Sequence, residues 1–188
     1  MLKINRPFLM QVHLILATFI FPIILMFLIT GALYTLGVRG SYDTQVYPLK
    51  LSTPLPKDSD TLTELITKEL ENLHLAPPTG ETRNKSTDER IELEWRGAAL
   101  RVTLASTPQP TEATLTVQKA SLYKRLIELH TANGATAFRI YAIVLAVSLF
   151  ILLVTGFIMA LQLPKYRKLT LYSTLTGMAV FILMVVTG

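Results

Sequence analysis

The sequence contains no cysteine among its 188 residues. This absence excludes disulfide bonds, cysteine-held iron–sulfur clusters and thiolate metal sites, although it says little about the redox state of the compartment. The chain also lacks a glycine-rich dinucleotide fingerprint, a Ser-His-Asp pattern and a His-Glu-x-x-His motif. We therefore predict no catalytic residues and no protein metal site, and the sequence argues against a self-sufficient enzyme.

Charged residues are missing from three long stretches, at positions 7–38, 140–164 and 169–188. Each is long enough to cross a bilayer, because about 20 apolar residues span the hydrocarbon core as a helix. The first run is about twice the length of a signal-peptide core of roughly 7–15 residues, and no A-x-A-like cleavage site follows it. The sequence therefore predicts a membrane protein with three helical spans, the first of them an uncleaved anchor.

A polar segment separates the first two spans and carries all thirteen Asp and Glu residues of the chain. The predicted division is a short N-terminus with the first span at 1–38, an outer domain at 39–136, the second span at 137–164, a turn at 165–168 and the third span at 169–188.

The distribution of positive charge predicts the orientation. The net charge is +5, but residues 40–136 hold eleven basic and thirteen acidic side chains, a net charge of −2 (11 − 13). The basic surplus therefore flanks the spans, which argues against nucleic acid as a partner. Lys3, Arg6 and the basic turn at 165–168 belong in the cytoplasm by the positive-inside rule. We expect a bacterial inner-membrane protein whose outer domain and C-terminus are periplasmic.

The polar segment reads as a small α+β domain. Apolar residues alternate along 91–96, 100–104 and 113–117, which predicts three antiparallel strands. A strand with Tyr42, Thr44 and Val46 comes first, and Pro48 suits an edge position. We expect the residues from 79 to 90 to form a loop.

Two helices are expected in the same segment. The first begins near Thr61, which has capping-box spacing to Glu64, and it carries an apolar stripe at intervals of three to four residues. It should lie across the apolar face of the strands. The second, at 122–130, leads back to the membrane.

Short phrases repeat around the spans. The first span contains His13 and ends with the motif Leu28-Ile29-Thr30-Gly31. The second span is preceded by Leu129-His130-Thr131 and contains Leu153-Val154-Thr155-Gly156, and the third span ends with Val185-Val186-Thr187-Gly188. In these phrases, and in the helix and strands between the spans, the chain resembles PepSY-associated transmembrane proteins over nearly its whole length. The resemblance implies helical spans with a PepSY-like periplasmic domain.

The resemblance also implies two kinds of function. Some family members are haem-bearing inner-membrane reductases that release iron from siderophores, and others are accessory proteins. For this chain we expect a non-catalytic accessory or regulatory subunit of an inner-membrane complex that handles electrons or iron. The alternative is a haem-bearing transmembrane electron carrier, and a third interpretation is a regulator that inhibits a periplasmic peptidase.

Two of the three histidines, His13 and His130, are candidate cofactor ligands. His13 lies about 10 Å into the first span, at 1.5 Å per residue, and an ionisable side chain inside a span indicates function. The other interpretation is a neutral imidazole bonded to a neighbouring helix. His130 is implied as a haem ligand by the resemblance, or is an ordinary surface residue of an amphipathic helix. For His74 we predict an exposed position and no role.

The predicted topology separates His13 from His130 by roughly the 30 Å of a membrane. One iron cannot bind both, so we expect no cofactor on the chain alone. Haem b would need further ligands from another chain or a second copy.

The small residues of the spans predict helix packing. Gly allows a second helix to approach closely, and Thr or Ser can hydrogen-bond a backbone carbonyl or a neighbouring helix. We expect packing at Thr30, Gly31, Thr155, Gly156, Ser173 and Gly177. Three spans offer little area for this, so a larger membrane complex or self-association is the expected partner, besides the lipid bilayer.

Overall fold

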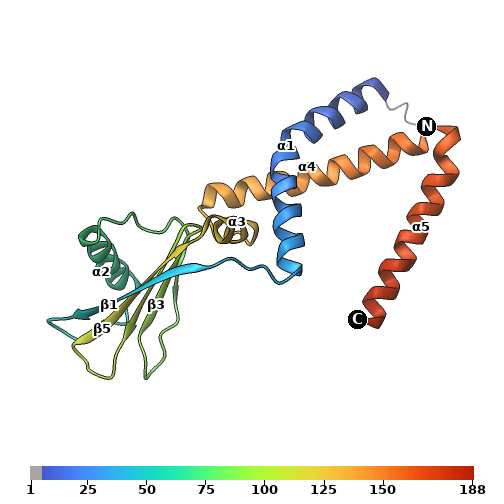
Figure 1. Ribbon diagram of the computed structural model, residues 1–188. Coiled ribbons are helices and arrows are strands. Elements are labelled where there is room, and N and C mark those ends of the chain that lie inside the picture. Colours follow the sequence, from blue (N-terminus) through green and yellow to red (C-terminus); the bar gives the residue numbers. More distant parts are fainter. Residues whose placement is uncertain (1–5) are drawn as a thin grey trace. The chain divides into compact units, whose positions relative to one another are not determined.

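The computed structural model describes residues 6–188 and contains three helices apolar and long enough to cross a membrane (Figure 1). They are α1 (Arg6–Thr35), α4 (Thr136–Leu161) and α5 (Pro164–Thr187). The prediction of a membrane protein with three apolar helices is confirmed. Lys3 and the rest of the predicted N-terminal flank lie outside the described residues.

The chain divides into two compact units. One combines residues 6–24 with Ile143–Gly188, and the other is Leu25–Ala142. Pro22 lies inside α1, close to the division. A proline has no backbone N–H, so α1 lacks one i→i−4 hydrogen bond at this point.

The second unit contains a five-stranded antiparallel sheet in the order β1-β5-β4-β3-β2. Its strands are β1 (Tyr42–Lys50), β2 (Thr82–Asn84), β3 (Glu92–Arg96), β4 (Leu100–Ser106) and β5 (Glu112–Ala120). As expected, β1 is an edge strand, and it pairs with β5 along its whole length. The predicted antiparallel sheet is confirmed, with two strands more than the meander of three.

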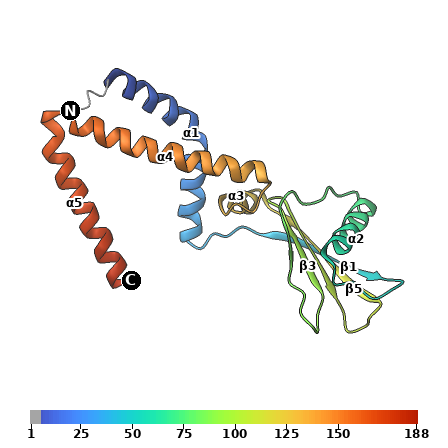
Figure 2. The same cartoon turned by 180° about the vertical axis from the view of Figure 1, so that it is seen from behind.

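Helix α2 (Ser59–Asn72) lies across one face of this sheet, as Figure 2 shows from behind. Its Leu62, Ile66 and Leu70 are fully buried, as the apolar stripe predicts. Opposite them, the inward residues of the alternating strands complete a core that includes Leu93, Val102, Leu104, Leu115 and Val117. Burial of this apolar area is the main source of stability of the unit.

Three local features differ from the prediction. The N-cap of α2 is Asp58, whose carboxylate accepts from the backbone N–H of Thr61, so the helix begins before the predicted capping box. The expected loop at 79–90 contains β2, which pairs with β3. Residues 165–168, predicted as a turn, belong to α5, because Pro164 occupies the first turn of a helix without needing a donor.

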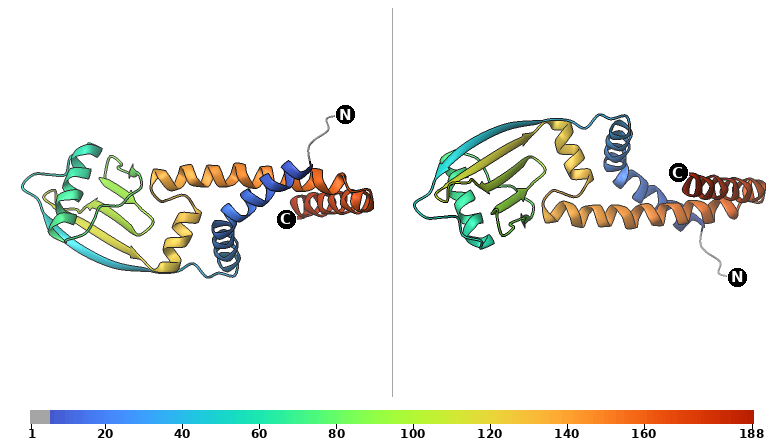
Figure 3. Two further views of the ribbon diagram at one scale, coloured as in Figure 1. Left: turned by 90° about the horizontal axis from the view of Figure 1, so that it is seen from above. Right: turned by 90° about the horizontal axis from the view of Figure 1, so that it is seen from below.

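Helix α3 (Leu122–His130) follows β5 directly and matches the predicted second helix (Figure 3). Ser121 caps it by accepting from the N–H of Lys124. The segment before β1 passes close to this cap, because a Cβ on Gly40 would lie 2.8 Å from the backbone nitrogen of Lys124. Only glycine fits there, and α3 is thereby packed against the chain that leaves α1.

Candidate functional site

His130, the last residue of α3, is hydrogen-bonded to α1. Its Nδ1 lies 2.7 Å from Oγ1 of Thr30, and its ring stacks on Phe27 with 4.3 Å between centroids. A Cβ on Gly31 would lie 3.6 Å from Cε1 of the imidazole, which is ordinary van der Waals contact. The ring is therefore fixed at one face, at Nδ1 and at Cε1.

The second hydrogen bond of Thr30 determines the tautomer of His130. The Thr30 hydroxyl lies 2.7 Å from the carbonyl oxygen of Met26, and a carbonyl only accepts. The single hydroxyl hydrogen must go to that carbonyl, so the hydroxyl oxygen accepts from His130 Nδ1–H. A neutral imidazole protonated at Nδ1 carries its lone pair on Nε2, which is the form that ligates metals.

A small apolar pocket adjoins this ring. Its volume is about 230 Å³, and it is lined by Thr30, Gly31, Tyr34, Ile127, His130 and Thr131. The hydroxyl of Tyr123 donates to the carbonyl of Val38 at 3.1 Å and to that of Thr30 at 3.4 Å. These contacts join α3 to the second half of α1.

His13 in the other unit has matching contacts at Nδ1 and Cε1. Its Nδ1 lies 3.0 Å from Oγ1 of Thr155 on α4, and that hydroxyl lies 2.8 Å from the carbonyl of Ile151. A Cβ on Gly156 would lie 3.5 Å from Cε1 of His13. By the same reasoning Thr155 accepts from Nδ1–H, and the lone pair is on Nε2.

The two histidines have the same kind of contact with a Thr-Gly pair. In each, the Thr of a Thr-Gly pair bonds to its own helix and to a histidine, while the adjacent Gly accommodates the imidazole edge. Thr30 and Thr155 are buried, at 1% and 7% exposed. Within residues 6–188 neither histidine makes a hydrogen bond through Nε2, so both keep a donor atom for a ligand.

The remaining predicted site residues lie apart from these two. Ser173 and Gly177 are on α5, which buries no residue, and nothing lies within 4 Å of a Cβ on Gly177. Thr187, of the third Thr-Gly pair, bonds the carbonyl of Leu183 at 2.9 Å. His74 follows α2 with a φ of 55°. In the described part of the chain no three ligand-type side chains gather to hold a metal ion.

A buried carboxylate that the sequence analysis missed fixes α3 to the sheet. Glu128 is 4% exposed and accepts from the Tyr42 hydroxyl at 2.7 Å and from the Asn133 amide at 2.8 Å. It also pairs with Lys124 at 3.0 Å. Burial acts to raise the pKa of this carboxyl, but the hydrogen bonds from Tyr42, Lys124 and Asn133 outweigh burial and lower it.

Glu94 is the second buried carboxylate, also 4% exposed. It pairs with Lys85 at 2.7 Å and with Arg96 at 2.8 Å, and Arg101 connects it to Glu128 with contacts of 3.6 and 3.4 Å. Burial opposes ionisation, yet hydrogen bonds from Arg96 and Lys85 lower the pKa of Glu94 to about 2. This ion-pair network positions α3, and with it His130.

One signal for the network was present in the sequence. Lys124 and Glu128 are four residues apart in a predicted helix, the spacing of an i,i+4 ion pair. Nothing in the alternation of β3 and β4 indicated that their polar face would be covered. Glu94 is buried on that face, where Lys85, Arg96 and Arg101 pair with it.

Comparison with known families gives one finding. Residues 2–162 match the PepSY-associated TM region, which covers both histidines and both Thr-Gly pairs described above. No curated protein and no solved structure matches the chain.

Proposed function

Since the chain belongs to the family of the PepSY-associated TM region, we propose that it is a haem-carrying subunit of a membrane electron-transfer assembly. One observation carries the proposal: both span-associated histidines, His13 and His130, donate Nδ1–H to a buried threonine and keep Nε2 for a ligand. The chain has three histidines, and two of them share this hydrogen-bond arrangement, which supports a ligating role.

Each of the two histidines could hold a haem iron as one protein ligand. His13 and His130 would each supply Nε2 to an iron, Thr155 and Thr30 would orient the rings, and Phe27 would pack behind His130. Haem supplies reversible one-electron chemistry when it is bound. The pocket beside His130, about 230 Å³, is smaller than the roughly 300–1,000 Å³ of small-molecule sites. We infer that a second chain would complete the pocket and supply a further ligand to the iron.

The proposed setting is a bacterial inner membrane with residues 39–136 and the C-terminus in the periplasm. The basic residues at 165–168 support a cytoplasmic position for the start of α5. In this orientation the sheet domain would contact the partner on the periplasmic side, while His13 on α1 and His130 at the end of α3 would be the haem ligands.

The test is a reduced-minus-oxidised absorbance spectrum of the full chain, purified in detergent from cells supplied with haem. Soret and α-band differences that decrease in His13→Ala and His130→Ala protein, and remain in His74→Ala protein, are the expected result. The His74 variant is matched in chemistry and lies away from both Thr-Gly pairs. Spectra equal in all three variants would contradict ligation by these histidines.

The second candidate is an accessory subunit without a cofactor. The observation that favours it is the exposed face of α5, which buries none of its residues in the described chain and so offers a whole helix to partner helices. In this case the His–Thr pairs would serve only to join helices. A difference spectrum without haem bands, together with co-purification of one defined membrane complex from native membranes, would favour the accessory function over electron transfer by bound haem.

A further inference from the structure

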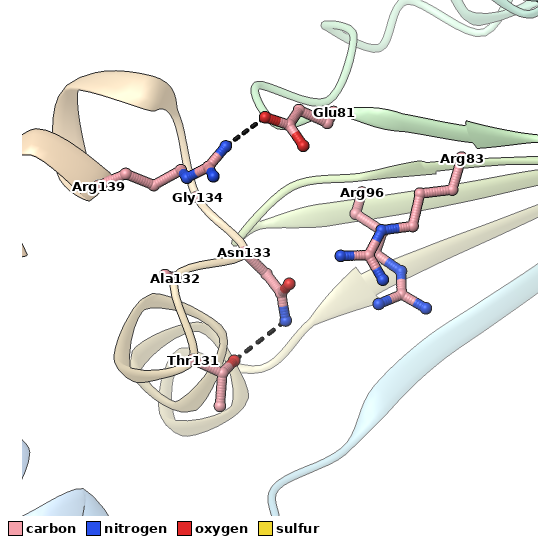
Figure 4. Close-up of a pocket in the computed structure, with 8 residues that line it drawn as sticks. All are labelled: Glu81, Arg83, Arg96, Thr131, Ala132, Asn133, Gly134 and Arg139. Atoms are coloured by element: carbon pink, nitrogen blue, oxygen red, sulfur yellow. Dashed lines mark hydrogen bonds and ion pairs between the residues drawn. The ribbon is translucent and has the colours of Figure 1, made fainter.

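A second pocket lies on the other side of Thr131, between the sheet and the start of α4. It has a volume of about 210 Å³, and Figure 4 shows the side chains around it: Glu81, Arg83, Arg96, Thr131, Ala132, Asn133, Gly134 and Arg139. The proposed function makes no use of it.

Three of the lining residues are arginines that come from separate elements. Arg83 on β2 is opposite Glu94 of β3, and Arg96 is two residues beyond Glu94, so both arginines lie on the same face of the sheet. Figure 4 shows their side chains extending in the same direction. Arg139 is in the first helical turns of α4 and pairs with Glu81 at the pocket edge.

The charge of this face is positive although the polar segment as a whole is negative. Among the residues that line the pocket, Arg83, Arg96 and Arg139 are basic and Glu81 is acidic, a net charge of +2 (3 − 1). Among residues 6–188 Arg83 forms no ion pair and is exposed. An anion is therefore the ligand that this face is built to attract.

Arg96 has a further unmet requirement. Its Nη2 donates to Glu94 at 2.8 Å, but its Nε is buried and has no hydrogen-bond partner within the described chain. Buried donors are nearly always satisfied, so an orphan N–H on a guanidinium beside a cavity needs an explanation. Nε itself is closed off from the pocket, but a guanidinium carries five N–H groups, and those on its Nη atoms that Glu94 does not use can donate to an anion in the pocket. A single arginine guanidinium can bind a phosphate through two parallel N–H groups.

The position of Arg139 indicates which anion is at hand. It is followed by the uncharged stretch of α4 that begins at Ile140, so it marks the level where a membrane-crossing helix leaves the hydrocarbon. Phospholipid head groups occupy that level. We propose that this pocket is a phosphate-binding site for the head group of an anionic phospholipid, with Arg83, Arg96 and Arg139 as its ligands.

The test is thermal unfolding of the full chain in an uncharged detergent, followed by the fluorescence of Trp95 and titrated with short-chain phosphatidylglycerol. Trp95 is the only tryptophan, and it reports on the unit that contains the pocket. We expect saturable stabilisation by phosphatidylglycerol. Short-chain phosphatidylcholine should give far less, because its choline cation is repelled.

Two variants with opposite expected effects separate binding from folding. Arg83→Gln removes an exposed, unpaired charge and should weaken binding about tenfold or more, the value of a charge-assisted hydrogen bond. Glu81→Gln removes the acid beside Arg139 and should tighten binding, which damage to the fold cannot imitate. Arg125→Gln, an exposed arginine of α3 away from the pocket, is the matched control and should bind as the unaltered chain does.

Each alternative outcome overturns a definite part of the proposal. Saturation by inorganic phosphate as tight as by phosphatidylglycerol would assign the pocket to free phosphate and reject the lipid. Equal weakening by Arg83→Gln and Arg125→Gln would show only a general charge effect and reject the site. Absence of stabilisation by any of the three probes would reject anion binding altogether.

Discussion

The hydroxyl of Tyr42, at the start of β1, donates a 2.7 Å hydrogen bond to the buried carboxylate of Glu128 near the end of α3. This bond connects the strand that follows α1 with the helix that precedes α4. Burial and the hydrogen bond to Glu128 both raise the pKa of Tyr42, so the hydroxyl stays a donor at every physiological pH. The position of His130, two residues beyond Glu128, depends on this connection.

Replacing Glu128 with Ala should destabilise the sheet-containing unit by about 3–5 kcal/mol. The reason is that Lys124 would remain partly buried without its counter-charge and Arg101 would keep only Glu94, and removal of one partner of a buried pair costs this much. Urea unfolding of the full chain, followed by Trp95 fluorescence, measures the change. Glu112→Ala, an exposed carboxylate on β5, is the control and should stay within about 0.5 kcal/mol.

The stability of this unit should fall in acid between about pH 4.5 and pH 2. The folded-state pKa of Glu94 is about 2 and its ordinary value is 4.5, so between these values the unfolded chain binds more protons. The contribution of Glu94 is therefore complete above pH 4.5 and is lost as the pH falls toward 2. Glu128, whose pKa is also lowered, acts in the same direction.

Urea unfolding midpoints measured from pH 2 to pH 7 test this dependence. In Glu94→Gln protein the step between pH 4.5 and pH 2 should become smaller, because the group that titrates there is gone. An acid step of unchanged size in that variant would contradict the assignment to Glu94.

The outer sheet could be predicted because its signals are local. Alternation along β3, β4 and β5 and the stripe of α2 both follow from one buried face, and the structure buries Leu93, Val102 and Ile66 as expected. The short strand β2 has no such pattern: its three residues are all exposed, and it pairs only as an edge. Its existence depends on a neighbour that local sequence does not reveal.

The candidate site was predicted in its parts but not in its pairing. His13, His130 and the Thr-Gly pairs were recognised along the chain, but which threonine meets which histidine depends on tertiary packing. The contact between Thr30 and His130 joins residues 100 positions apart. No periodicity contains that information.

Gly40 and Gly37 form a matched pair for a test of packing at the start of α3. Both have positive φ, +69° and +88°, so Ala should cost about 1 kcal/mol at either position. At Gly40 the new Cβ would also meet the backbone of Lys124 at 2.8 Å, while nothing lies within 4 Å at Gly37. Gly40→Ala should therefore lose clearly more stability than Gly37→Ala in urea unfolding. Equal losses would show that α3 shifts at no cost.

His74→Gly should stabilise the sheet-containing unit by about 1 kcal/mol. His74 has a φ of 55° just after the end of α2, where the N–H of Leu75 bonds to the carbonyl of Leu70. Such helix ends favour glycine, because a Cβ is strained in this conformation. His74→Ala is the control, since it removes the imidazole but keeps the strain. If the two variants were equally stable, the backbone argument would be wrong.

Thr30→Val should loosen His130, whereas Thr30→Ser should not. Valine has nearly the shape of threonine but leaves Nδ1–H of His130 without its acceptor, and serine keeps the hydroxyl that bonds both His130 and Met26. The loss of one net hydrogen bond is worth about 1 kcal/mol, so the thermal midpoint should fall in the valine variant alone.

Nitrogen-15 shifts of the His130 ring provide a second readout, because only the valine variant frees the imidazole to populate the Nε2–H tautomer. If both variants kept the Nδ1–H form, the tautomer would be determined by something other than Thr30, and the claim that this threonine prepares His130 for a ligand would fail.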